Sequence, residues 1–162
     1  MQRNGFCVSR RDRGASAVEF ALIMPLFFIL LFGIVDFGWF FFNQHTIQYA
    51  TREGVRLALV GGTLKNPDGS SMSREASIIK EIKDSAAAAV NPANLRISIF
   101  PVKADDYSDP NDWDTADPDA GAGGDFMRVR VRYTYQYLTP MIGTFLSDKI
   151  IQAEALYRNE LF

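Results

Sequence analysis

The chain has 162 residues, of which 48% are hydrophobic, and its formal net charge is −2. This length accommodates one water-soluble domain of roughly 100 residues beside a membrane anchor. The single cysteine, Cys7, excludes a disulfide within one chain.

The most apolar part of the chain runs from residue 15 to residue 42. At ~1.5 Å per residue, the 21 residues from Ala15 to Val35 would span roughly 30 Å as a helix, about one hydrocarbon core. Aromatic residues at 37 and 39–42 close the segment, where a membrane–water interface is expected. A cleaved secretory signal has a shorter apolar core that ends in small residues. We therefore predict a transmembrane helix over residues 15–42.

The charge is distributed unevenly. Four arginines and one aspartate give residues 1–14 a charge of +3, which leaves −5 on residues 15–162. Basic segments beside a span stay in the cytoplasm. We therefore expect the basic leader, residues 1–14, in the cytoplasm and the C-terminal head in the periplasm or outside the cell.

The junction between leader and span carries a recognisable pattern. The leader is followed by Gly14, four small or apolar residues, Glu19 and Phe20. This arrangement resembles type IV pilin-like precursors, in which a membrane prepilin peptidase cuts after the glycine. The resemblance implies a processing site between Gly14 and Ala15.

Glu19 is an acid one turn inside an apolar helix. A carboxylate in hydrocarbon costs about 2.5–3.5 kcal/mol on insertion scales, so it needs a partner or an interface. Cleavage after Gly14 would create an ammonium on Ala15, and on a neighbouring subunit that group is a natural counter-ion for Glu19. The alternative is that Glu19 only snorkels to the lipid headgroups.

Three motifs in order extend the resemblance. Residues 14–25 (GASAVEFALIMP), 33–38 (GIVDFG) and 50–56 (ATREGVR) are similar to the TadE-like family, minor pilin-like proteins of the Tad (tight adherence, Flp pilus) machinery. The resemblance implies a non-enzymatic pseudopilin that assembles or primes such an adhesion pilus. It also implies a place in the bacterial inner membrane or in the pilus itself. The implied partners are other pilin-like subunits, the major pilin, the inner-membrane pilus platform and the prepilin peptidase.

Beyond the span, the pattern predicts an amphipathic helical stalk over residues 43–62 and an α+β head over residues 63–162. Apolar residues of the stalk form one stripe at Ile47, Ala50, Gly54 or Val55, and Ala58. In the head, Ser73 can cap a helix to about residue 90, and alternating residues predict strands near 95–101, 127–137 and 150–158. We expect this helix, with a core face at Ile79, Ile82, Ala86 and Ala89, to pack on a roughly three-stranded antiparallel sheet.

An acidic loop is predicted over residues 104–125. Four aspartates, at Asp112, Asp114, Asp117 and Asp119, offer calcium hard oxygen ligands. These aspartates form two pairs, Asp112 with Asp114 and Asp117 with Asp119. Neither pair is followed by the glycine and closing acid of a calcium-binding loop, so we favour a solvated loop without metal. Three arginines alternate along the second strand, at 128, 130 and 132. We expect them to pair with the acidic loop or with Glu154 and not to bind nucleic acid.

The sequence predicts neither an enzyme nor a cofactor. The single histidine, His45, and Cys7 fall on opposite sides of the predicted membrane, and no phosphate-binding or nucleophile motif is present. Two alternatives stay open. One is a pseudopilin of a related secretion system, and the other is a signal-anchored periplasmic binding domain.

Overall fold

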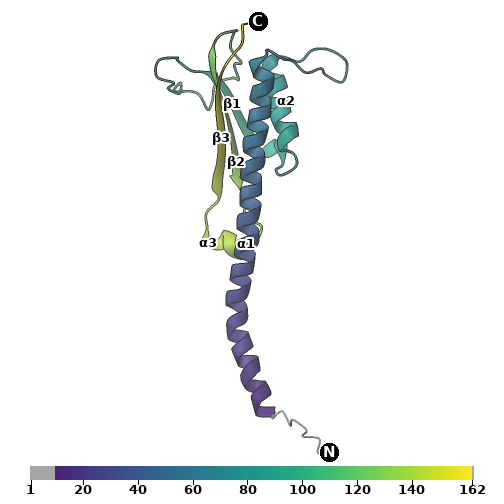
Figure 1. Cartoon of the computed structure of the whole chain (residues 1–162), viewed down its shortest axis with the longest axis vertical. Coiled ribbons are helices and arrows are strands. Elements are labelled where there is room, and N and C mark those ends of the chain that lie inside the picture. Colours follow the sequence, from purple (N-terminus) through teal and green to yellow (C-terminus); the bar gives the residue numbers. More distant parts are fainter. Residues whose placement is uncertain (1–9, 162) are drawn as a thin grey trace, which may run out of the picture. The chain divides into compact units, whose positions relative to one another are not determined.

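The structure, a computed structural model, describes residues 10–161, without the side chains of residues 10–13, 141, 142 and 145. Most of the predicted leader, Cys7 included, lies outside the described residues. Three helices, a short 3₁₀ turn and three strands follow one another (Figure 1). They are α1 (Arg10–Leu59), α2 (Arg74–Ala86), η1 (Pro92–Asn94), β1 (Leu95–Pro101), β2 (Phe126–Tyr135), α3 (Pro140–Phe145) and β3 (Lys149–Arg158).

The fold is α+β, as predicted, and it divides into two compact units. The first ends at Gly38 and the second runs from Trp39 to the C-terminus. In the first unit α1 continues through Pro25. In its described residues, 10–38, this unit is a single helix.

The second unit begins with the last part of α1, which carries the predicted apolar stripe. Ile47, Ala50 and Ala58 are fully buried, and Val55 is nearly so. The helix ends in a glycine-based cap, in which Gly61 N donates to Ala58 O and the next amide donates to the carbonyl of residue 57, both at 3.1 Å. Gly61 has a φ of +64°, which a residue without a Cβ adopts at no steric cost.

Helix α2 packs on α1 with a face slightly different from the predicted one. Its cap is as predicted, because the Ser73 side chain accepts a hydrogen bond from Ala76 N at 3.1 Å. Its fully buried residues include Ile78 beside the predicted Ile82 and Ala86, and the predicted Ile79 and Ala89 are partly buried against the same core. The two helices approach closely at Gly54 of α1. A Cβ on Gly54 of α1 would lie 2.4 Å from Cγ1 of Ile82, so the glycine makes room for this side chain.

The three strands form an antiparallel sheet in the order β1-β2-β3. Ile97 is paired with Val131, and Val131 with Ala153. Met127, Val129 and Val131 of the central strand are fully buried and belong to the same core as the apolar residues of α1 and α2. The two helices therefore cover one face of the sheet, and the three arginines of β2 project from the other.

Candidate functional site

The predicted processing and assembly residues lie on one exposed stretch of α1. Gly14, Ala15, Glu19 and Phe20 are all exposed, and a Cβ built on Gly14 would meet nothing within 4 Å. The four-residue spacing places Glu19 one helical turn after Ala15. The described structure thus leaves this stretch open to an enzyme or to another subunit.

The same helix exposes an unusually large apolar surface. Between residues 18 and 42 most of its large hydrophobic side chains are exposed, by 37% at Trp39 to 75% at Leu22, while Met24 and Phe40 are half-buried. The helix over residues Gly14–Leu59 is long and apolar enough to cross a membrane, and none of its most apolar part is buried. Apolar surfaces of this size are covered by lipid or by other proteins.

The aromatic residues at the end of this surface divide into two groups. The ring of Phe40 meets the ring of Tyr135 edge-on, with 5.2 Å between centroids. Trp39, Phe41 and Phe42 stay exposed at 37%, 52% and 45%. Phe40 therefore packs α1 against the sheet of the head. Trp39, Phe41 and Phe42 remain exposed and extend the apolar surface to the level at which a membrane–water interface is expected.

Asp36 is an enclosed acid near the end of the exposed apolar stretch of α1. Its side chain is 2% exposed, while Ile34 and Phe37 on either side are 72% and 60% exposed. A buried carboxylate must be compensated by hydrogen bonds or charge. The Asp36 side chain is therefore not part of the exposed apolar surface.

The arginine row of β2 meets the acidic loop, as expected. Arg128 and Arg130 both pair with Asp109, and Arg132 pairs with Asp114. Arg130 also donates to Glu154 of β3, with Nε and Nη2 at 3.0 and 2.8 Å from the same carboxylate oxygen. These contacts explain why the row is not an open basic surface.

Arg130 is the most enclosed of the three arginines, with a side chain that is 9% exposed. Burial by itself would lower the pKa of Arg130, but hydrogen bonds to Glu154 and Asp109 outweigh it and raise that pKa. The guanidinium also stacks over the ring of Trp113, 4.3 Å from its centroid, and Arg132 lies over the same ring at 4.6 Å. Such cation–π contacts are attractive, and more so when they are shielded from water.

The acidic loop is consequently less solvated than predicted. Trp113 is partly buried, and Ala120 is fully buried as part of the hydrophobic core of the head. Asp119 N donates to Ile99 O of β1 at 3.0 Å. The correction has a simple cause, since the aspartates of the loop neutralise the arginine row and bring the loop onto the outer face of the sheet.

The four weak calcium candidates do not converge. The Asp114 carboxylate is paired with Arg132, and Oδ1 of Asp119 accepts from Gly121 N at 2.8 Å. Asp112 and Asp117 are exposed elsewhere on the loop. Among the described residues no group of three or more acidic, histidine or cysteine side chains could hold a metal ion.

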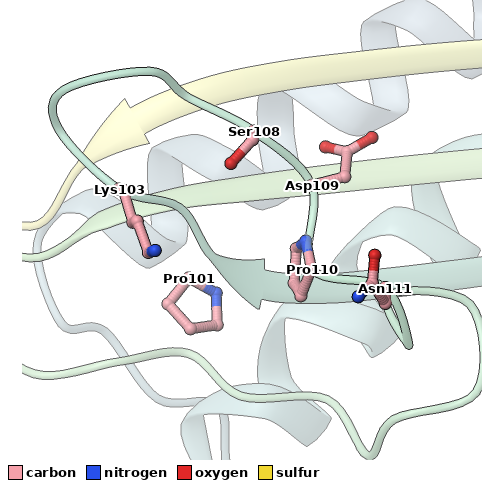
Figure 2. A pocket seen from close by; sticks show the side chains of 6 residues that line it. All are labelled: Pro101, Lys103, Ser108, Asp109, Pro110 and Asn111. Atoms are coloured by element: carbon pink, nitrogen blue, oxygen red, sulfur yellow. The ribbon is translucent and has the colours of Figure 1, made fainter.

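A hollow of about 310 Å³ opens beside this loop (Figure 2). Figure 2 shows Lys103 and Asp109 on opposite sides of it, with Pro101, Ser108, Pro110 and Asn111 completing the lining. The Asp109 carboxylate is already engaged by two arginines. The ionisable side chains that line the hollow are therefore this paired carboxylate and the exposed Lys103.

Arg74 is a structural residue that the sequence pattern did not reveal. From the first position of α2, Nη1 donates to Gly121 O at 2.7 Å, and Nη2 donates to Ala58 O at 3.2 Å and to Asn159 Oδ1 at 3.3 Å. It thereby joins the end of α1, the acidic loop and the end of β3. A single arginine after a helix cap is typical of an exposed surface position. No pattern in the neighbouring residues could therefore have indicated that Arg74 joins three segments of the head.

Comparison with known proteins bears on the exposed helix. Residues 14–56 match the family described as TadE-like protein. This segment of the chain is therefore similar to TadE-like proteins. The match begins at Gly14, the glycine that precedes the exposed apolar stretch, and ends within the buried stripe of α1. The family is one of pilus-associated structural proteins. No curated protein and no solved structure matches the chain significantly.

Proposed function

We propose that this chain is a non-enzymatic minor pilin-like subunit required to assemble or prime a Tad pilus, and that a prepilin peptidase cuts it after Gly14. The observation that carries the proposal is the TadE-like match over residues 14–56, which begins at Gly14 on an exposed apolar helix. An acid, Glu19, lies one turn further along this helix. An exposed apolar helix would hold the subunit in the membrane before assembly, and an acid near its start would be available to pair with a neighbouring subunit in a helical filament.

The proposed organisation follows from the same features. Residues 1–14 form the cytoplasmic leader, residues 15–42 the single inner-membrane span, residues 43–62 the stalk and residues 63–162 the head outside the cytoplasm. The apolar surface of the span meets lipid before assembly and the helices of neighbouring subunits afterwards. Its partners are therefore the major pilin, similar minor subunits and the membrane platform.

Glu19 has a specific part in this proposal. After cleavage, the new ammonium of Ala15 on one subunit pairs with the Glu19 carboxylate of its neighbour. In surroundings of low dielectric such a pair is sensitive to geometry, and breaking it leaves a buried charge without a partner. The pair therefore sets the register between subunits more than it adds to the overall stability of the filament.

The test replaces Glu19 in a strain that depends on this chain for piliation. Glu19→Leu should insert into the membrane at least as well as the natural chain, because an apolar residue is favoured there. It should nevertheless fail to support pili, whereas Glu19→Asp, which keeps the carboxylate, should restore part of the piliation. If Glu19→Leu assembles pili at the natural level, Glu19 only snorkels and the pairing proposal is wrong.

A further inference from the structure

The connection between β2 and β3 is unusually apolar. The eleven residues from Tyr137 to Ser147 carry no charge, and they include α3 with the sequence Pro-Met-Ile-Gly-Thr-Phe. Leu138 and Leu146 are 53% and 43% exposed, and Ile150 at the start of β3 is 65% exposed. Connections at the surface are normally polar, so exposed apolar residues gathered in one connection mark a binding surface.

The position of this connection is fixed by the sheet. Tyr135 and Lys149 form the last pair of the β2–β3 ladder, so the connection leaves and rejoins the sheet at this end. Figure 1 shows α3 at the same end. The Tyr135 ring contacts Phe40, with centroids 5.2 Å apart, and Tyr137 contacts Tyr135 at 5.4 Å. The connection therefore starts level with the aromatic residues of α1.

That level coincides with the end of the apolar part of α1. Trp39, Phe41 and Phe42 are exposed, and polar residues begin at Asn43. Aromatic side chains are enriched at the membrane–water interface, where apolar residues of a span give way to polar ones. The exposed leucines of the connection thus lie beside the part of the helix where a bilayer would end.

We propose that the segment from Leu138 to Leu146 inserts into the headgroup region of the bilayer and gives the head a second membrane contact beside α1. The inference rests on the proposed anchoring of α1, and the occupant that we assign to this surface is lipid. Lipid fits because the surface is continuous with the exposed aromatic residues of the anchor. It also fits because the next basic residue, Lys149, is exposed where it can reach the phosphates.

A second contact has a mechanical consequence. A head joined to the membrane by one helix can rotate about that helix and tilt away from the bilayer. Two contacts hold it in one orientation, which presents the same face of the sheet to every neighbour. On entering the filament the segment exchanges lipid for protein, so its release accompanies assembly.

The test measures the depth of spin labels in the full chain, reconstituted in vesicles of phosphatidylcholine and phosphatidylglycerol. Cys7 is replaced by serine, and single labelled cysteines are placed at Leu138 or Leu146. Labels at Phe27, which is 54% exposed in the apolar part of α1, and at Leu161, which is 87% exposed near the C-terminus, serve as lipid and water references. Collision with oxygen reports lipid, and collision with a nickel chelate reports water.

The expected result is that labels at 138 and 146 collide several-fold more with oxygen, and several-fold less with the chelate, than the label at 161. If they match the 161 label while the Phe27 label lies in lipid, the inference fails and the anchoring stands. If the Phe27 label is also accessible from water, the anchoring itself fails. Labels shielded from both reagents would mean burial in protein and would also overturn the inference.

A variant pair provides an independent check. Leu146→Asp should expose the label at position 138 to the chelate, because a carboxylate is expelled from the headgroup region towards water. Leu161→Asp, at a leucine outside the connection that is more exposed than Leu146 (87% against 43%), should leave that label unchanged. Equal effects of the two substitutions would contradict a local membrane contact.

Discussion

The two parts of helix α1 have the same secondary structure and opposite surface chemistry. From residue 18 to residue 42 the large hydrophobic side chains point in all directions and are mostly exposed. From Ile47 to Ala58 they form one stripe, which is buried against α2 and the sheet. The change falls between Phe42 and Asn43, where Nδ2 of the asparagine donates to Trp39 O.

This contrast shows where the apolar side chains of each part of the helix find apolar surroundings. A helix that is apolar all round needs apolar surroundings from outside the chain, which a bilayer or a bundle of identical helices supplies. A helix with a single stripe finds those surroundings within its own fold. The first part is therefore a surface for other molecules, and the second part is a structural element of the head.

The strongest test of this contrast is a substitution within the stripe. Ile47→Ala should lower the free energy of unfolding of the head by about 2–5 kcal/mol, because it removes buried methyl groups and leaves a cavity. Tyr49→Ala, at a side chain that is 58% exposed two residues later, should change it by less than about 0.5 kcal/mol. Urea unfolding of the full chain in detergent micelles measures both. Equal effects would contradict the assignment of the stripe to the core.

A charge placed in the first part should act on insertion and not on the head. Leu26→Arg should raise the free energy of membrane insertion by about 3 kcal/mol, since Leu26 lies near the middle of the apolar segment. The head should unfold at the same urea concentration as before. The fraction of chain recovered in membranes measures the first effect, with Tyr49→Arg as the control. Normal insertion of Leu26→Arg would argue against a span there.

A smaller effect concerns the enclosed core of the head. Burial raises the pKa of Tyr157 to about 12 from its ordinary value of 10.0. Between pH 10 and pH 12 the unfolded chain loses this proton while the folded chain keeps it. The stability that depends on the neutral phenol is thus complete below pH 10 and declines as the pH rises to about 12.

Tyr157→Phe isolates this contribution. Because the Tyr157 hydroxyl has no hydrogen-bond partner in the described structure, the change at neutral pH should be less than about 1 kcal/mol. The variant should lose less stability than the natural chain when unfolding is followed into the alkaline range. Tyr49→Phe, at an exposed tyrosine, should decline as the natural chain does. Parallel curves for the natural chain and Tyr157→Phe would show that Tyr157 is not enclosed.

Much of the fold could be predicted from periodicity. The 3.6-residue spacing of the stripe and the alternation of Met127, Val129 and Val131 reflect directly which side of an element is buried. The end of α1 just before Gly61 was also predictable, because glycine closes helices in a left-handed conformation. These features depend on neighbouring residues, which a single sequence displays.

The errors concern contacts between distant segments. The full burial of Ile78 beside Ile82 was not predicted, because the crossing of two helices at Gly54 cannot be derived from either helix alone. The loop around Trp113 packs because its aspartates reach the arginines of a strand elsewhere in the chain. For the site, the positions of Gly14 and Glu19 were visible in the sequence, whereas the open space around Gly14 required coordinates.

The most direct test of the account is the mass of the chain extracted from membranes of cells that contain a prepilin peptidase. The account predicts a mature chain that begins at Ala15 and lacks Cys7, and it predicts that Gly14→Leu abolishes this product. Gly33→Leu is the matched control, since a Cβ at either glycine meets nothing within 4 Å. A full-length natural chain with its first 14 residues still attached would contradict the account.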